Sequence, residues 1–133
     1  MDGYKITLVN KGSGSSNAYK NVNVSGECFP DGNFIVLNIR GIQNGPADGI
    51  ALYDSTGSLV EFISYEGVVT YNGVTSIDVG VAESSSTPAT HSLQRIGDGC
   101  KGDDFTWEIP SPSSRGTVNS GQSISCGGAC VDV

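Results

Sequence analysis

The sequence predicts an all-β protein with the architecture of a β-sandwich. Its 133 residues include 19 glycines, and only 16% of them are charged, which suits a chain rich in turns. No long stretch has the 3.6-residue period of an amphipathic helix, whereas short alternating segments recur with turn residues between them. We find no internal repeat or domain boundary. We therefore expect a single domain over residues 1–133, with a Cys-containing tail at 123–133.

The first two strands are expected at Tyr4–Val9 and Tyr19–Val24. Both segments alternate apolar and polar side chains, as half-buried strands do. A turn follows at residues 28–33, where a proline and a glycine favour a reversal of the chain. The next segment, Phe34–Ile39, is strongly apolar, so we expect a strand at the centre of a sheet.

A hairpin is expected between Asp48 and Glu66. Its turn begins with Asp54, whose carboxylate can accept backbone N–H bonds, and ends with Gly57, which can take a positive φ. The second strand, Leu59–Tyr65, is apolar at almost every position. That pattern predicts a strand that is covered on both faces or lies at the centre of a sandwich.

The later part of the chain predicts shorter elements, and its aromatic side chains, like those of Phe34 and Phe62, are expected in the core. In order, these elements are a strand edge with an Asn-Gly turn at 68–73, a short strand or irregular segment at 75–79, a strand at Ser92–Ile96, a strand at Phe105–Ile109 and a Pro/Ser turn at 110–116.

Several motifs occur together in a characteristic order. Asp-Gly-Ile-Ala-Leu at 48–52 is followed by Leu-Val-Glu-Phe-Ile-Ser-Tyr-Glu-Gly at 59–67, and further pieces lie at 41–47, 86–94, 105–107 and 116–122. Over residues 3–122 this series resembles the lamin-tail domains of bacteria. The resemblance implies an immunoglobulin-like β-sandwich, from a family found in nuclear lamins and in secreted bacterial proteins, some of them nucleases. In that family the domain is a structural or interaction module and not the catalytic one.

The chain departs from that family at its beginning. Tyr4 stands where the family has the Trp of a Gly-Trp-x-Leu strand, and the one or two strands that normally precede it are missing. A missing strand leaves backbone N–H and C=O groups unpaired along a sheet edge. The chain could be a fragment, its C-terminal tail could fold back into the gap, or a neighbouring chain could supply the strand. The last arrangement builds a filament if its rotation does not close a ring.

Charge and hydropathy exclude some partners. The formal net charge is −7, so the surface repels the phosphates of nucleic acids. No apolar run is long enough to span a membrane.

The four cysteines, Cys28, Cys100, Cys126 and Cys130, predict disulfides and therefore an extracellular or cell-surface location. Four cysteines allow three pairings. A short Cys126–Cys130 loop is sterically possible, and Cys28–Cys100 would then join two loops. A zinc site of four cysteines is less favoured, because the sequence lacks paired C-x2-C spacing.

Few residues suggest catalysis or metal binding. His91 is the only histidine, and without a Gly-x-Ser-x-Gly elbow we expect it to be exposed or hydrogen-bonded at the start of a strand. Asp98, Asp103 and Asp104 are weak candidates for a calcium site, because their spacing does not match an EF-hand loop. A solvated acidic loop is the preferred interpretation, and no cofactor is expected.

Other polar residues suggest glycans or sugar chemistry. Asn23 begins an Asn-Val-Ser glycosylation triplet, and the Ser/Thr-rich residues 83–90 could carry O-linked sugars. Glu61 with Glu66 could serve as paired carboxylates for glycoside hydrolysis, but they belong to the hairpin shared with the non-enzymatic family. Tyr65 and Tyr71 could line a sugar-binding face.

We therefore expect a non-enzymatic extracellular structural or interaction module that self-associates through open sheet edges as a filament subunit. One alternative is an accessory lamin-tail module of a larger secreted enzyme such as a nuclease. The other is a carbohydrate- or calcium-dependent binding module.

Overall fold

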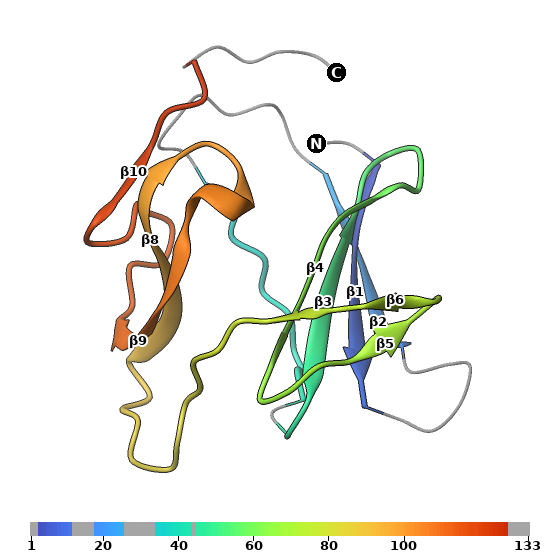
Figure 1. The fold of residues 1–133 in the computed structure, drawn as a ribbon, viewed down its shortest axis with the longest axis horizontal. Coiled ribbons are helices and arrows are strands. Elements are labelled where there is room, and N and C mark those ends of the chain that lie inside the picture. The colour runs from blue at the N-terminus through green and yellow to red at the C-terminus, as the bar shows by residue number, and fades with distance from the viewer. Residues whose placement is uncertain (1–2, 12–17, 26–33, 44, 128–133) are drawn as a thin grey trace. The chain divides into compact units, whose positions relative to one another are not determined.

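The computed structural model describes residues 3–11, 18–25, 34–43 and 45–127 (Figure 1). The chain forms two compact units. Unit 1 comprises Met1–Glu27 and Asn38–Gly80, and unit 2 comprises Cys28–Leu37 and Val81–Val133. The all-β prediction is confirmed, whereas the single domain stays a prediction, because it concerns how the units combine. The described residues contain one short 3-10 helix, η1 (Gly102–Asp104), and no helix that could cross a membrane.

Unit 1 contains a five-stranded sheet with the order β2-β1-β3-β4-β7. All neighbours pair antiparallel except β4 and β7, which run parallel. A separate two-stranded hairpin is formed by β5 and β6. The strands are β1 (Tyr4–Asn10), β2 (Ala18–Val24), β3 (Asp48–Tyr53), β4 (Leu59–Tyr65), β5 (Thr70–Tyr71), β6 (Val74–Thr75) and β7 (Ile77–Asp78).

The predicted turns of unit 1 are confirmed. Between β3 and β4, Asp54 Oδ1 accepts the backbone N–H groups of Thr56 and Ser58, each at 2.9 Å, and Gly57 has a φ of 84°. Between β5 and β6, Asn72 and Gly73 have φ values of 49° and 76°. Positive φ at both central residues is what a type I′ hairpin turn requires, so Asn-Gly sets the register of this hairpin.

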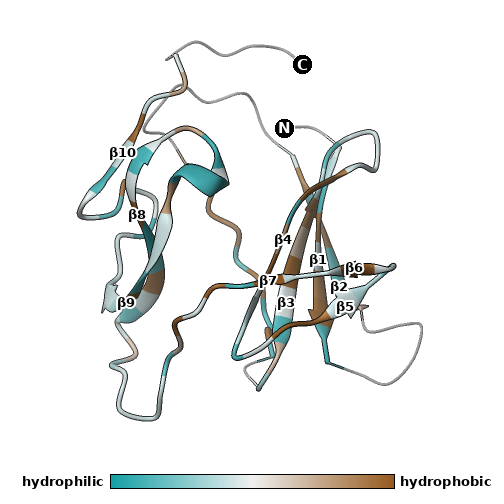
Figure 2. Cartoon of the chain, in the orientation of Figure 1, coloured by the Kyte–Doolittle hydropathy of each residue, from teal (hydrophilic) through white to brown (hydrophobic). Residues whose placement is uncertain are grey.

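One face of the unit 1 sheet carries the main buried cluster, while Leu8 and Val24 are buried on the opposite face. Val9, Ala51 and Phe62 are buried in that cluster with Val69, which lies just before β5, so the β5–β6 hairpin covers the face that carries it. A Cβ on Gly49 would lie 2.9 Å from Phe62 Cε2, so only glycine fits beneath the phenyl ring. The hydrophobic colouring of β1, β3 and β4 in Figure 2 matches their central place in this sheet.

Two buried serines, Ser64 in β4 and Ser76 just after β6, link the β5–β6 hairpin to the sheet by hydrogen bonds. Ser76 Oγ donates to Ser64 Oγ at 2.6 Å and accepts the backbone N–H of Val69 at 2.8 Å. A backbone hydrogen bond also joins Ser76 and Val69, because Ser76 N donates to Val69 O at 2.8 Å. Each buried hydroxyl is thereby hydrogen-bonded, which removes the cost of burying it.

Unit 2 contains a three-stranded sheet with the order β10-β8-β9. The central strand β8 (His91–Gly99) pairs antiparallel with β9 (Thr106–Pro112) and parallel with β10 (Gln122–Ile124). A register shift between Ser92 and Gln94 places a bulge in the β8–β9 ladder. The strands predicted at Ser92–Ile96 and Phe105–Ile109 are confirmed with shifted ends, and residues 122–124 of the C-terminal part fold back onto β8.

Several sequence expectations were wrong. Phe34–Ile39 is not a strand: it belongs to no sheet of the described chain, and the boundary between unit 2 and unit 1 falls within it, after Leu37. Residues 110–112 belong to β9 and not to a turn. The strand β4 is not covered throughout, since Leu59 and Val60 are 38% and 53% exposed.

The aromatic residues also depart from the expected core. Of the described tryptophan and phenylalanines, only Phe62 is buried, while Phe34, Phe105 and Trp107 are half-buried. Phe29 lies outside the described residues.

Candidate functional site

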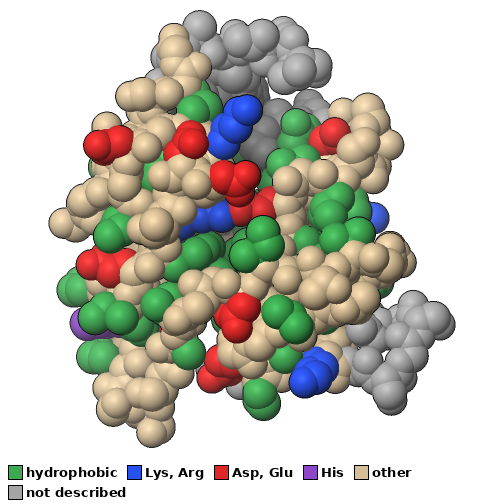
Figure 3. Space-filling model, in the orientation of Figure 1, with side chains coloured by type: hydrophobic (Ala, Val, Ile, Leu, Met, Phe, Trp, Pro, Cys, Tyr) green, Lys and Arg blue, Asp and Glu red, His purple; other side chains and the backbone are tan. Residues whose placement is uncertain are grey.

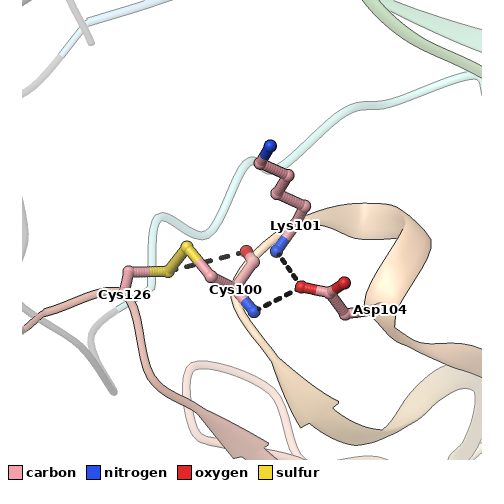
Figure 4. Close-up of a disulfide and its surroundings, with 4 residues drawn as sticks. All are labelled: Cys100, Lys101, Asp104 and Cys126. Atoms are coloured by element: carbon pink, nitrogen blue, oxygen red, sulfur yellow. Dashed lines mark hydrogen bonds between the residues drawn. A yellow bond between two sulfur atoms is a disulfide. The ribbon is translucent and has the colours of Figure 1, made fainter.

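The acidic loop of unit 2 is organised by Asp104. Its Oδ2 accepts the backbone N–H groups of Cys100 and Lys101, each at 2.9 Å (Figure 4). These two bonds lower the pKa of Asp104, with that of Cys100 contributing most. No three His, Cys, Asp or Glu side chains of the described residues gather as a metal site. Asp103 and Asp104 lie in η1, in a turn that the Asp104 carboxylate closes through the backbone, whereas Asp98 lies within β8 and pairs with Ser123 of β10.

One disulfide lies beside this turn, between Cys100 and Cys126, with Cα atoms 4.9 Å apart (Figure 4). This pairing replaces the one weighed from the sequence, in which Cys126 joined Cys130 and Cys28 joined Cys100. Short spacing in the sequence did not decide the matter, because β10 runs beside β8 and brings Cys126 to the end of that strand. Cys28 and Cys130 lie outside the described residues.

His91 in unit 2 and the glutamates Glu61 and Glu66 in unit 1 lie in a strand or directly after one. His91 opens β8, is half-buried, and has Nδ1 at 3.3 Å from Pro110 O, which agrees with the hydrogen-bonding role expected at a strand start. Glu61 lies within β4 opposite Leu52, whereas Glu66 follows the strand with a φ of 59°. Neither glutamate lines the groove described below.

Tyr65 and Tyr71 do not form one sugar-binding face. Tyr71 packs against the core cluster that contains Phe62. Tyr65 is three positions from Phe62 on the same strand, so its side chain points to the opposite side of the sheet. The Tyr65 hydroxyl donates to Gln43 O at 2.8 Å, and burial raises its pKa to about 12.

The strand β2 is an edge of the unit 1 sheet. No strand of the described chain pairs with its outer side. Tyr19 forms a bulge, since Leu8 pairs with Lys20 and Val9 with Ala18. The Tyr19 hydroxyl accepts Gln43 N–H at 3.0 Å, and Lys20 Nζ donates to Arg40 O. These contacts hold the bulged end and leave residues 20–24 as a regular edge.

The other edges are shorter or better protected. The strand β9 is as long as β2, but Pro110 and Pro112 within it have no N–H to offer a partner. The strands β7 and β10 have two and three residues. The strand β2 contains no proline and one charged residue. The glycosylation candidate Asn23 is exposed on this strand, opposite Lys5.

A groove of about 420 Å³ lies within unit 2. Its walls come from residues 34–36, from β8 and β9, and from the loop that joins β9 to β10. That volume falls in the range of small-ligand sites. Phe34, Val36 and Trp107 supply apolar surface, while Arg95, Arg115 and Asn119 are among the polar residues.

Arg95 and Trp107 face each other across the β8–β9 ladder. They are directly paired, and the Arg95 guanidinium carbon lies 4.8 Å from the centre of the Trp107 ring. This cation–π contact orients the guanidinium on a flat surface. Arg95 and Arg115 could not be selected from the sequence, because they lie 20 residues apart without a motif, and only the fold brings both to one groove.

No protein-family model, curated protein or solved structure that was compared with the chain matches it. The resemblance to lamin-tail domains therefore stays a prediction from the motifs.

Proposed function

We propose that this protein is a non-enzymatic structural or interaction module that self-associates by strand addition at β2. The observation that carries the proposal is the edge itself, a seven-residue strand with no pairing partner among the described residues and no proline. Such an edge is a template for main-chain hydrogen bonds from another chain. The occupant we propose is a strand of a second copy.

The proposal includes a lamin-tail type of immunoglobulin-like sandwich and an extracellular or cell-surface location. The motif order at 48–67 supports the former. The Cys100–Cys126 bridge supports an oxidising compartment. Pairing of β2 with β2 would close a two-fold dimer, whereas pairing with a different strand would repeat head to tail and build a filament.

A charge placed on the edge tests the proposal. Asn23 is exposed on β2, so Asn23→Lys introduces a device that natural edge strands use against pairing. Ser120→Lys makes the same charge change at an exposed position in unit 2 and serves as the control. Sedimentation velocity over a range of concentrations should show association of the wild type and of Ser120→Lys, and weaker association of Asn23→Lys. A wild type that stays monomeric throughout contradicts the proposal, and so does equal association of all three proteins.

A further inference from the structure

We propose that the partner of β2 is the β2 strand of a second copy, paired antiparallel so that Val22 of each chain lies opposite Val22 of the other. This inference rests on the proposed function, because it requires association at β2, and it adds the partner strand, the register and the size of the assembly. The assembly is a closed dimer, since both copies use the same edge and each has a single β2.

The lengths of the sheet edges favour β2 as its own partner. A strand is paired along its whole length only by a strand that is equally long. The outer side of β4 lacks a described neighbour only at residues 59–62, because β7 pairs with Ile63 and Ser64. The strand β9 contains two prolines, and β7 and β10 are shorter. Among the described strands, a second β2 therefore matches the β2 edge best.

The geometry of an antiparallel pair restricts the register. The two-fold axis of such a dimer is perpendicular to the sheet, so residues that face each other point to the same side of it, and the pairing is centred on a residue. The bulge at Tyr19 leaves residues 20–24 as the regular edge. Centring the pair on Val22 matches all five of these residues, whereas centring on Asn21 or Asn23 matches three.

The side chains that this register brings together are compatible. On one side of the sheet, Val22 meets Val22, which is an apolar cross-strand pair of the kind that stabilises sheets. On the other side, the exposed Asn21 faces the exposed Asn23 of the second copy. Thr7 Oγ1 donates to Asn21 Oδ1 at 2.8 Å, which orients the amide. The Asn21 Nδ2 group can then donate to Asn23 Oδ1 across the interface.

The charge of the edge favours the same register. Each copy has a formal net charge of −7, and acidic side chains are spread over the side of the molecule seen in Figure 3. The strand β2 has no acidic residue, and its single charge is on Lys20. With Val22 at the centre, the two Lys20 residues lie about 14 Å apart, beyond the roughly 8 Å over which charges act at physiological salt. Centring on Asn21 would bring them to about 8 Å, where they still repel.

Cysteine cross-linking with a mild oxidant tests the register. Residues directly opposite each other have Cα atoms about 4.5 or 5.5 Å apart, within the range of a disulfide, whereas a displacement of two positions gives roughly 8 Å, which is beyond it. We expect Val22→Cys to form a linked dimer at about tenfold or higher yield than Ser120→Cys, an exposed site in unit 2 that measures random collision. Asn21→Cys and Asn23→Cys should stay at the collision level alone and form a linked dimer when mixed before oxidation.

Sedimentation velocity of the wild type separates this inference from the proposed function. A wild type that stays monomeric contradicts association at β2 itself. If the wild type associates, the register is overturned by Val22→Cys linking no more than Ser120→Cys, or by linked dimers of Asn21→Cys or Asn23→Cys alone. Growth beyond two copies overturns the closed dimer. Mass spectrometry identifies the joined cysteines, thermal unfolding shows that each variant is folded, and the mixed pair tests the register without changing Val22.

Discussion

Unit 1 and unit 2 are both built from β-strands, but their interiors differ. All seven buried hydrophobic residues of the described chain, Leu8, Val9, Val24, Ala47, Ala51, Phe62 and Val69, lie in unit 1. In unit 2 the only buried residue of the described part is the polar Gln94. Gln94 Nε2 donates to Pro112 O at 2.8 Å and to Ser111 O at 3.3 Å, so its amide joins β8 to β9.

The two units therefore gain stability in different ways. Unit 1 depends on apolar burial, which is the main favourable term in folding. Part of it lies in the cluster beneath the β5–β6 hairpin, and part at Leu8 and Val24 on the opposite face of the sheet. Unit 2 has little of that term and depends on the Cys100–Cys126 bridge and on side-chain bonds to the backbone. Small folds with weak cores commonly use disulfides in this way. One all-β chain thus combines a unit stabilised by apolar burial with a unit stabilised by a disulfide and side-chain hydrogen bonds.

The largest effect is expected from emptying the core of unit 1. Phe62→Ala should lower the free energy of unfolding by about 3–5 kcal/mol, because the phenyl ring is buried in the cluster with Val9 and Ala51. Phe105→Ala in unit 2 is the matched control, since that ring is half-buried. Denaturant unfolding followed by circular dichroism measures both. If both variants lost the same free energy of unfolding, the two units would not differ in how much they depend on apolar burial.

Removal of the Cys100–Cys126 bridge should weaken unit 2. The bridge closes a sequence separation of 26 residues, for which loop entropy gives about 3.5 kcal/mol. In Cys100→Ser/Cys126→Ser we expect faster proteolysis within unit 2, with little change in unit 1. Limited proteolysis with mass spectrometry locates the cuts. New cuts that fall in β1 or β3 would contradict this assignment.

Gly49 tests how closely unit 1 is packed. In Gly49→Ala the added methyl group would meet the Phe62 ring at 2.9 Å and Ile63 O at 3.2 Å, so we expect a loss of about 1–3 kcal/mol. Gly45→Ala is the control, because its nearest contact would be Asp48 Oδ2 at 3.8 Å. Thermal unfolding of the two variants should differ clearly, and similar midpoints would show that the close contact carries no energy.

The smallest effect is expected at Tyr65. Burial raises its pKa to about 12, so the folded protein holds the phenol proton more tightly than the unfolded chain does. The stability linked to this group is complete below the unfolded pKa of about 10 and is lost between about pH 10 and 12. Tyr65→Phe should lose about 1 kcal/mol at neutral pH, with the hydrogen bond to Gln43, and should become less sensitive to alkali. Unfolding curves at several alkaline pH values measure this, and an unchanged alkaline slope would refute it.

Local turn chemistry made much of unit 1 predictable. Asp54 and Gly57 at one turn, and Asn72-Gly73 at the other, have the conformations that their residue types favour, and alternation located β1 to β4 closely. The strand β7 was less certain, because two residues are too few for a period to be recognised.

The errors arose where distant segments decide the structure. Phe34–Ile39 has the composition of a buried strand, yet it forms no strand ladder with any segment that the structure describes, and apolar content alone does not provide one. The Cys100–Cys126 pairing depends on the parallel pairing of β10 with β8, and no local sequence pattern predicts that strand pairing. Arg95 and Arg115 became neighbours in a groove for the same reason, so the groove could not be predicted from the sequence.

Hydrogen exchange of the native protein shows whether the disulfide stabilises unit 2 while apolar burial stabilises unit 1. We would compare the wild type with Cys100→Ser/Cys126→Ser, residue by residue, over the described strands. We expect protection to fall by a large factor in β8, β9 and β10 and to stay nearly constant in β1, β3 and β4, which contribute to the buried cluster around Phe62. Equal loss of protection in both sheets, or no loss in unit 2, would contradict this expectation.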